Sequence, residues 1–251
     1  MQIFKGIESI TGFGATVITV GSFDGVHKGH SSLLELLTAR AKATGHKSVV
    51  VSFSPHPRVT LGRAEGLQLL TSDREKAQFL ENQGVDALLL LEFNDAFSAL
   101  SYREFLLDYL QAQAGMEEII VGFNNHMGSD AGSYDDLVLL AQENNFEVTL
   151  FEEFIQQGEA ISSTLIRSLL SKGEIESANN LLSHPYLIIG EADEKGRVHL
   201  EEPLKLLPPA GIYSALVNHR EEYVTIDSEK RVKCEQKNST VKIKLLSKNE
   251  K

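Results

Sequence analysis

Short apolar runs alternate with helical patterns over the first 185 residues of the chain. The apolar runs that have the length of buried strands lie at residues 16–20, 48–53, 87–93, 118–121 and 147–151. After the first run, Leu33, Leu34, Leu36, Leu37 and Ala41 form an apolar stripe at helical spacing. This rhythm is typical of βαβ units, in which helices connect the strands of a parallel sheet. We therefore expect an α/β domain built on such a sheet.

Helix start signals fall between these runs. Ser72 and Glu75 have the spacing of a capping box, and so do Ser101 and Glu104. Each pair predicts a helix that begins just after the serine. Further helices are expected over residues 135–144, 164–170 and 175–182.

The pattern changes after Pro185. Short apolar runs, separated by glycine, proline and charged residues, predict strands at 186–190, 198–200, 212–217, 223–226 and 241–246. The sequence shows no convincing helical stripe among them. We therefore divide the chain into an α/β domain over residues 1–185 and a small all-β, barrel-like domain over residues 186–251.

Composition excludes several protein classes. The chain has 251 residues, of which 42% are hydrophobic and 24% charged, as expected for a globular protein with a sizeable core. Cys234 is the only cysteine, which excludes an internal disulfide and a cysteine zinc cluster and favours the reducing cytoplasm. Residues 1–5 do not resemble a secretory signal, and no purely apolar run is longer than Ala87 to Leu91, which is too short for a membrane span.

The formal net charge of −11 is unevenly distributed. Residues 1–185 contain 24 acidic and 12 basic residues, whereas the remainder contains 11 and 12. Such an acidic surface repels a nucleic-acid backbone, so no nucleic-acid partner is expected. Between Arg103 and Lys172 the only lysine or arginine is Arg167, and its position therefore calls for a specific role.

A glycine-rich stretch from Gly21 to His30 separates the first predicted strand from the following helix. Backbone amides at a helix N-terminus bind phosphate, and glycine allows a ligand to approach the backbone closely. The spacing of His27 and His30 places both imidazoles on one face of the first helical turn. The strand-to-helix context favours a phosphate site over an ordinary surface turn.

Three hydroxyl residues, Ser162 to Thr164, precede Arg167 at the start of another predicted helix. Together they combine N-terminal donors with a guanidinium that can bind phosphate through two hydrogen bonds. Taken alone, the same pattern also fits an ordinary capped helix with a solvated arginine.

Two further stretches follow strands. In the stretch from Phe53 to Arg58, two prolines stiffen an aromatic and cationic edge at the carboxyl end of the second strand, where ligands bind in open α/β sheets. Residues 121–128, after the fourth strand, carry Asn124 and Asn125, whose amides could contact a base or ring edge or simply form a turn.

The order of these motifs resembles one family. Gly21 to His30 resembles the HxGH signature of the nucleotidyltransferase superfamily, in the variant carried by prokaryotic FAD synthetases. Residues 53–57 resemble the second motif of that family, and residues 161–167 resemble its ISSTxIR motif. HxGH alone is shared with other nucleotidyltransferases, but three ordered motifs are more specific. The resemblance implies a Rossmann-like nucleotidyltransferase domain over residues 1–185.

The resemblance also implies a reaction, in which FMN and ATP give FAD and pyrophosphate with Mg²⁺. ATP and FMN are then the small-molecule partners. The FMN phosphate is already anionic and needs no general base, so catalysis consists of positioning and charge neutralisation.

Site roles follow from the same match. The ATP-binding residues that it implies are Gly21, Phe23, Asp24, His27, Gly29, His30, Asn124, Ser163, Thr164 and Arg167. Among them, His27, His30 and Arg167 are expected to be catalytic, the histidines on the ATP phosphates and Arg167 on the leaving pyrophosphate. Asp24 is expected to orient the loop or a metal-bound water. The residues expected to border the flavin are Phe53, His56, Pro57 and Asn124.

Two features depart from the family pattern. After Asn124 the family usually carries an arginine, but the run Asn125 to Gly128 has none. The 66 residues after Pro185 are about half the length of the family's riboflavin kinase barrel. Residues 206–213 resemble part of that barrel, but its Gly-Phe-Pro-Thr-Ala-Asn motif is absent. We therefore expect a shortened barrel without kinase activity.

Three other functions remain open from the sequence. They are nucleotidyl transfer to a different phosphate-bearing acceptor, a bifunctional riboflavin kinase/FAD synthetase, and a flavin- or nucleotide-binding regulator without turnover. The proline-rich motif at residues 53–57 argues against the first, and the missing arginine motivates the last.

Overall fold

The computed structural model describes residues 1–122, 126–152, 155–156 and 159–249, with side chains undescribed for residues 155–156 and 159–160. Contacts within the chain group it into two compact units. Unit 1 comprises Met1–Phe23, His30–Gly66 and Phe79–Phe154. Unit 2 comprises Asp24–Gly29, Leu67–Gln78 and Ile155–Lys251.

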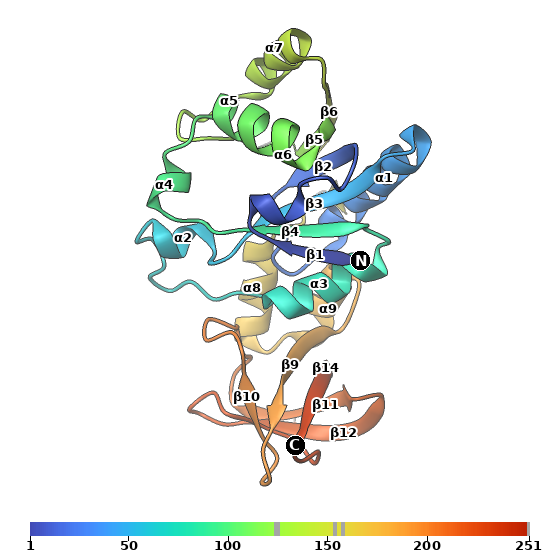
Figure 1. Ribbon diagram of the computed structural model, residues 1–251. Coiled ribbons are helices and arrows are strands. Elements are labelled where there is room, and N and C mark those ends of the chain that lie inside the picture. Colours follow the sequence, from blue (N-terminus) through green and yellow to red (C-terminus); the bar gives the residue numbers. More distant parts are fainter. Residues whose placement is uncertain (123–125, 153–154, 157–158, 250–251) are drawn as a thin grey trace. The chain divides into compact units, whose positions relative to one another are not determined.

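Unit 1 is built on a six-stranded sheet in which every neighbouring pair is parallel (Figure 1). In spatial order the strands are β1 (Gln2–Lys5), β4 (Ala87–Leu91), β3 (Lys47–Phe53), β2 (Thr16–Val20), β5 (Met116–Gly122) and β6 (Glu147–Phe151). The three strands β2, β3 and β4 are buried over nearly their whole length. Burial on both faces explains why their sequences are continuous apolar runs rather than alternating ones. The predicted α/β, Rossmann-like fold is confirmed.

The chain changes its winding direction between β2 and β5. From β2 it proceeds to β3 and β4 on one side, whereas β5 and β6 lie on the other side. Loops that leave the carboxyl ends of β2 and β5 therefore diverge, and in open α/β sheets ligands bind at this point. The loop after β2 begins with Gly21, which places the first sequence motif at this position.

The helices follow the predicted apolar and capping patterns. The first long helix, α1 (Lys28–Thr44), buries Leu33, Leu34, Leu37 and Ala41. Ser101 and Glu104 form the predicted capping box. The other helical segments described before residue 145 are η1 (Ile7–Ile10), α2 (Pro57–Thr60), α3 (Asp73–Asn82), α4 (Asp95–Ser98), α5 (Tyr102–Glu104), the π-helical η2 (Phe105–Gln111), α6 (Ala112–Ala114) and α7 (Tyr134–Asn144).

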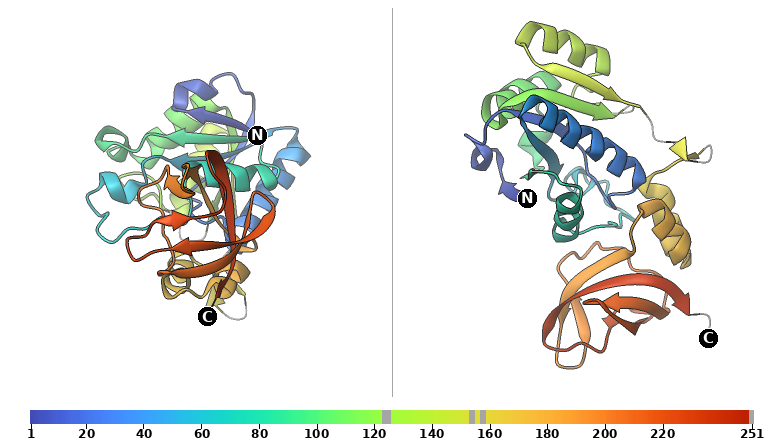
Figure 2. Two further views of the ribbon diagram at one scale, coloured as in Figure 1. Left: turned by 90° about the horizontal axis from the view of Figure 1, so that it is seen from below. Right: turned by 90° about the vertical axis from the view of Figure 1, so that its right-hand side faces the viewer.

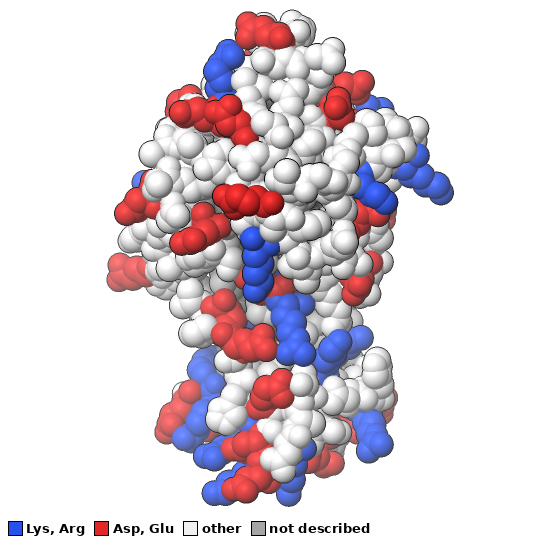
Figure 3. Space-filling view, in the orientation of Figure 1, with Lys and Arg blue, Asp and Glu red and all other residues white. Residues whose placement is uncertain are grey.

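Unit 2 contains a closed antiparallel barrel in the order β10-β13-β12-β11-β14-β9 (Figure 2). Its strands are β9 (Tyr186–Ala192), β10 (Arg197–Leu200), β11 (Gly211–Val217), β12 (Arg220–Ile226), β13 (Val232–Lys233) and β14 (Ser239–Asn249). On the face shown in Figure 3, acidic and basic side chains are intermixed over the barrel, in agreement with its balanced composition. The expected all-β barrel is confirmed.

Two helices precede the barrel and share its core. They are α8 (Ser163–Lys172) and α9 (Ile175–Leu182), and a short hairpin of β7 (Ile155–Gln156) and β8 (Glu159–Ala160) comes before them. Ile166 and Leu170 of α8 belong to the same buried cluster as Tyr186, Val224 and other barrel residues. The apolar stripes of both helices are therefore buried by β-strands of the barrel.

Several element limits differ from those expected. Strand β4 ends at Leu91 rather than at residue 93, and β14 extends from Ser239 to Asn249. Strand β1 was not predicted, because its residues are mostly exposed and carry no buried pattern. Within the described ranges, no helix combines the length and the hydrophobicity that a membrane crossing requires.

Candidate functional site

The loop between β2 and α1 has an unusual backbone. Phe23 and Val26 adopt positive φ angles of 47° and 41°, although neither is glycine, and both are buried. Such conformations cost free energy and persist only where the surrounding contacts impose them, most often at functional sites. Gly25, with φ of 89°, lies between them. A Cβ atom on Gly25 would lie 2.7 Å from Cδ1 of Leu70, so another residue would displace that side chain in addition to straining a backbone that favours glycine.

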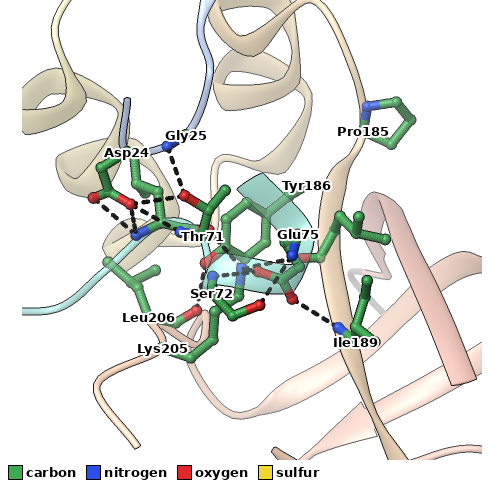
Figure 4. A network of polar contacts seen from close by, with 12 residues as sticks. Asp24, Gly25, Thr71, Ser72, Glu75, Pro185, Tyr186, Ile189, Lys205 and Leu206 are labelled. Carbon is green, nitrogen blue, oxygen red and sulfur yellow. Dashed lines mark hydrogen bonds and ion pairs between the residues drawn. The ribbon is translucent and has the colours of Figure 1, made fainter. Parts of the chain in front are cut away.

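Asp24 occupies the centre of a buried network in unit 2 (Figure 4). Its carboxylate accepts hydrogen bonds from the backbone N–H groups of Leu70, at 2.9 Å, and Thr71, at 2.9 Å. The hydroxyl of Thr71 donates to the same carboxylate at 3.1 Å and accepts from the N–H of Gly25. These bonds fix the loop of Asp24 against the segment that precedes α3.

Arg167 completes this network from α8. Its Nη2 atom lies 2.6 Å from Oδ2 of Asp24, and its Nε donates to the carbonyl oxygen of Gln68 at 2.7 Å. The sequence predicted Arg167 as a phosphate ligand, and the structure adds that a buried carboxylate balances its charge. A guanidinium has five N–H donors, and these two bonds use two of them.

The start of α8 contacts the same loop. Ser162 is the N-cap residue, and its side chain accepts from the N–H of Leu165. The hydroxyl of Ser163 donates to the backbone carbonyl of Asp24 at 2.8 Å. Thr164 is exposed in the first turn of the helix. Two motifs that lie about 140 residues apart in the sequence are thus directly hydrogen-bonded.

The two histidines of the first motif have different surroundings. His27 is buried, and burial lowers its pKa to about 4, although the charge of Asp24 acts in the opposite direction. The imidazole of His27 is therefore neutral at pH 7 and offers one N–H donor. His30 lies in the first turn of α1, after Gly29, and is only partly buried. Its ring centroid is 5.0 Å from that of Phe23.

An aromatic cavity of about 510 Å³ lies within unit 1. The residues that line it are Val20, Gly21, Phe53, Leu61, Arg63, Phe93, Phe97, Ser98, Leu100, Phe105, His126, Met127, Gly128 and Ser129. The ring centroids of Phe53 and Phe97 are 5.7 Å apart, and those of Phe53 and Phe93 are 5.4 Å apart. Aromatic walls of this kind bury a flat apolar ring well.

The structure brings only part of the predicted flavin-contacting set to this cavity. Phe53 lines it, but His56 and Pro57 are not among its lining residues. His56 is instead the N-cap of α2, where its Nδ1 accepts from the N–H of Arg58 at 3.2 Å. Asn124 lies outside the described residues.

Sequence reasoning missed several residues. Gln68, Leu70 and Thr71 act mainly through backbone groups, which leave no sequence signal. Phe97 and Phe105 are contributed by the segment between β4 and β5 and line the same cavity as Phe53 only in the folded chain. Phe105 opens η2, and π-helical segments often occur at functional sites.

The residues present do not form a metal centre of their own. Nowhere in the described ranges do three His, Cys, Asp or Glu side chains come together as a metal site requires. The carboxylate of Asp24 is occupied by Leu70, Thr71 and Arg167. Of the two roles expected for Asp24, this geometry fits the orientation of the loop.

Comparison with known proteins identifies the family. The family model described as FAD synthetase matches residues 11–165, which is more than half of the chain. The chain belongs to the FAD synthetase family. This membership confirms the resemblance drawn from the three motifs and the expectation of a nucleotidyltransferase enzyme.

Two relatives of this FAD synthetase family member are named for two activities. The bifunctional riboflavin kinase/FMN adenylyltransferase of Listeria monocytogenes is 33% identical over 211 residues, covering 79% of this chain and 66% of that protein. The protein of the same name from Escherichia coli K12 is 32% identical over 231 residues, covering 86% of this chain and 73% of that protein. The chain thus spans about two thirds to three quarters of the length of these relatives.

A solved structure supports the fold. The crystal structure of a macrolide-efflux protein from Streptococcus pneumoniae matches with a TM-score of 0.84 at 23% identity, covering 99% of this chain and 91% of that chain. At this identity the match establishes the α/β sheet with a following barrel, and no function.

The buried histidine makes the stability of this protein depend on pH. The folded state holds His27 neutral down to a pKa of about 4, whereas the unfolded value is 6.5, so the unfolded state binds more protons between these values. The free energy of unfolding therefore decreases as the pH falls below 6.5. We expect the contribution of His27 to the free energy of unfolding to decrease by about 2 kcal/mol between pH 7.5 and pH 5.

Urea denaturation at the two pH values measures this effect. The variant His27→Asn should lose less stability on acidification than the wild type. The losses of the two proteins should differ by about 2 kcal/mol. The variant His219→Asn, which alters an exposed histidine, serves as the control. Equal pH dependence in all three proteins would show that His27 is not held neutral.

Proposed function

We propose that this FAD synthetase family member transfers AMP from ATP to the phosphate of FMN and releases pyrophosphate. The observation that carries the proposal is the direct bonding of two motifs. The hydroxyl of Ser163 and the guanidinium of Arg167 both bind Asp24, at 2.8 Å and 2.6 Å, at the loop where the first helix begins. The motif at the start of α8 is thereby joined to the loop of the first motif, as a triphosphate site built from both motifs requires.

The proposed chemistry uses groups that need no proton transfer. An oxygen of the FMN phosphate attacks the α-phosphorus of ATP, a new P–O bond forms, and the bond to the leaving pyrophosphate breaks. His27, which is neutral at pH 7, and His30 would donate hydrogen bonds to the phosphate oxygens of ATP. Thr164 and Arg167 would hold the leaving pyrophosphate, and Ser163 would contribute its backbone N–H, because its hydroxyl donates to Asp24. Mg²⁺, which we expect to bind with ATP, would neutralise charge on the phosphates.

We assign the flavin ring to the aromatic cavity. The cavity lies in the unit that carries the switch point of the sheet, and Phe53, Phe93 and Phe97 give it flat apolar walls. Arg63 also lines it and offers a cation in a chain whose asparagine motif lacks the usual arginine. Met127 lies in the cavity lining and is buried, so it fills space at the position where that motif departs from the family.

We further propose that the barrel lacks riboflavin kinase activity and that residues 1–185 carry the adenylyl transfer. The barrel closes from β9 to β14 within residues 186–249, and the Gly-Phe-Pro-Thr-Ala-Asn motif does not occur in that sequence. The family resemblance assigns the ATP and metal contacts of the kinase to this motif, so its absence supports the loss of kinase activity.

The single buried Cys234 fits a cytoplasmic location.

One experiment tests both proposals. The protein is incubated with FMN, ATP and Mg²⁺, then with riboflavin in place of FMN, and the products are separated by chromatography. We expect FAD and pyrophosphate from the first mixture and no FMN from the second. Failure to form FAD would refute the transferase assignment, and FMN made from riboflavin would refute the loss of kinase activity. Replacing ATP by CTP checks the nucleotide preference.

A further inference from the structure

A buried lysine of unit 2 contacts the segment that precedes α3, which is the segment that binds the carboxylate of Asp24. The side chain of Lys205 is 2% exposed, and its Nζ atom donates to three oxygens: the carbonyls of Leu70, at 2.5 Å, and Leu187, at 2.7 Å, and Oε2 of Glu75, at 2.6 Å. An ammonium group has three N–H donors, so all of them are satisfied. The Nζ atom also lies 4.3 Å from the ring centroid of Tyr186.

The partner carboxylate is equally constrained. Glu75 accepts from the N–H of Ser72 at 2.8 Å, which forms half of the capping box of α3, and from the N–H of Ile189 in β9 at 2.7 Å. Burial lowers the pKa of Lys205, while the neighbouring charge of Glu75 raises it. Removing charges from water is costly, and such a pair persists only where each donor and acceptor is satisfied, as here (Figure 4).

The peptide groups of Leu70 connect this ion pair to the candidate site. The carbonyl oxygen of Leu70 accepts from Lys205, and its N–H donates to the carboxylate of Asp24. Asp24 in turn holds Arg167. Two backbone bonds strengthen the same junction, since the N–H of Leu69 donates to Leu204 at 2.7 Å and the N–H of Leu206 donates to Leu69 at 2.8 Å.

We propose that Lys205 is a positioning residue for adenylyl transfer: its ammonium fixes the Leu70 carbonyl, and the Leu70 and Thr71 amides then hold Asp24 and, through it, Arg167. The barrel thereby has a role in the transferase reaction that is independent of any kinase chemistry. The expected effect of Lys205 on kcat rests on the proposed function, whereas its expected effect on the order of residues 67–72 does not.

The test compares Lys205→Met with the wild type and with Val224→Ala, a barrel-core variant outside the network. Because the backbone bonds of Leu69 remain, we expect kcat for FAD formation to fall about tenfold in Lys205→Met, with a smaller change in the KM for ATP. Hydrogen exchange of the peptide that spans residues 67–72 should become faster in the same variant. Val224→Ala controls for a general loss of barrel stability and should change neither property.

A second variant guards against misfolding. Lys205→Met leaves the carboxylate of Glu75 buried without its cation, so the double variant Lys205→Met, Glu75→Met removes both charges together. It should show the same loss of kcat and of protection. Wild-type kcat and protection in either folded variant would overturn the inference. If the wild type itself makes no FAD, the proposed function fails, and the exchange of residues 67–72 alone decides the role of Lys205.

Discussion

Replacing His30 by alanine is expected to lower kcat for FAD formation by about 10²-fold or more. His30 lies in the first turn of α1, directly after the loop that leaves the switch point of the sheet. At that position an imidazole N–H would act together with the helix N-terminus on a bound phosphate. A donor that stabilises charge in the transition state has no substitute in a methyl group, so the loss should appear mainly in kcat.

Steady-state rates at saturating FMN and varied ATP measure this loss. His46→Ala is the matched control, because it removes a partly buried histidine that follows the opposite end of the same helix. Melting temperatures of both variants establish that the fold is retained. A His30→Ala enzyme with the wild-type rate would show that the first motif does not act on the phosphates of ATP.

Replacing Arg167 by lysine should lower kcat to a similar extent, about 10²-fold, although the charge is kept. The guanidinium bridges Asp24 and the carbonyl of Gln68 through two separate nitrogens and keeps further N–H groups for a phosphate. A lysine ammonium presents its three donors from one nitrogen, so it cannot reproduce the separated nitrogens that bind Asp24 and Gln68 and also offer a planar fork to an anion. Pyrophosphate inhibition should weaken in parallel, because the leaving group would lose the same contacts.

Arg197→Lys provides the comparison for this substitution. Arg197 also pairs with an aspartate, Asp193, at 2.7 Å, but the Arg197 side chain is exposed on the barrel. Exposed ion pairs contribute little, so this variant should keep the wild-type rate and stability. If Arg167→Lys behaves like Arg197→Lys, the bridging geometry of Arg167 has no catalytic importance.

The chemistry of the candidate site was largely predictable from the sequence, but its connections were not. His27, His30, Ser163 and Arg167 stand out because imidazole, hydroxyl and guanidinium groups at helix starts are suited to phosphate. The pair of Arg167 with Asp24 joins residues 143 positions apart. Nothing in the local sequence of either residue indicates the other, and the backbone donors of Leu70 and Thr71 carry no side-chain signal.

The same limit applies to the aromatic cavity. Phe53 was expected near a ligand because it ends a strand at the binding edge of the sheet. Phe93, Phe97 and Phe105 come from the segment that links β4 to β5, where aromatic residues could equally serve the core. The pairing of β3 with β4 brings Phe93 beside Phe53, and the segment that then crosses to the other side of β2 adds Phe97 beside Phe53 and Phe105 to the cavity lining.

The parallel sheet, the barrel, the helix starts and the residue types proposed for phosphate binding could all be inferred from the amino-acid sequence, since each depends on apolar periodicity or on side chains within one helical turn. The tertiary structure decided which distant groups meet: edge strand β1, the Asp24–Arg167 pair, the ring cavity and the buried Lys205. The physical reason is that backbone pairing and the burial of a charge depend on all the elements that surround a residue, and no short stretch of sequence contains that information.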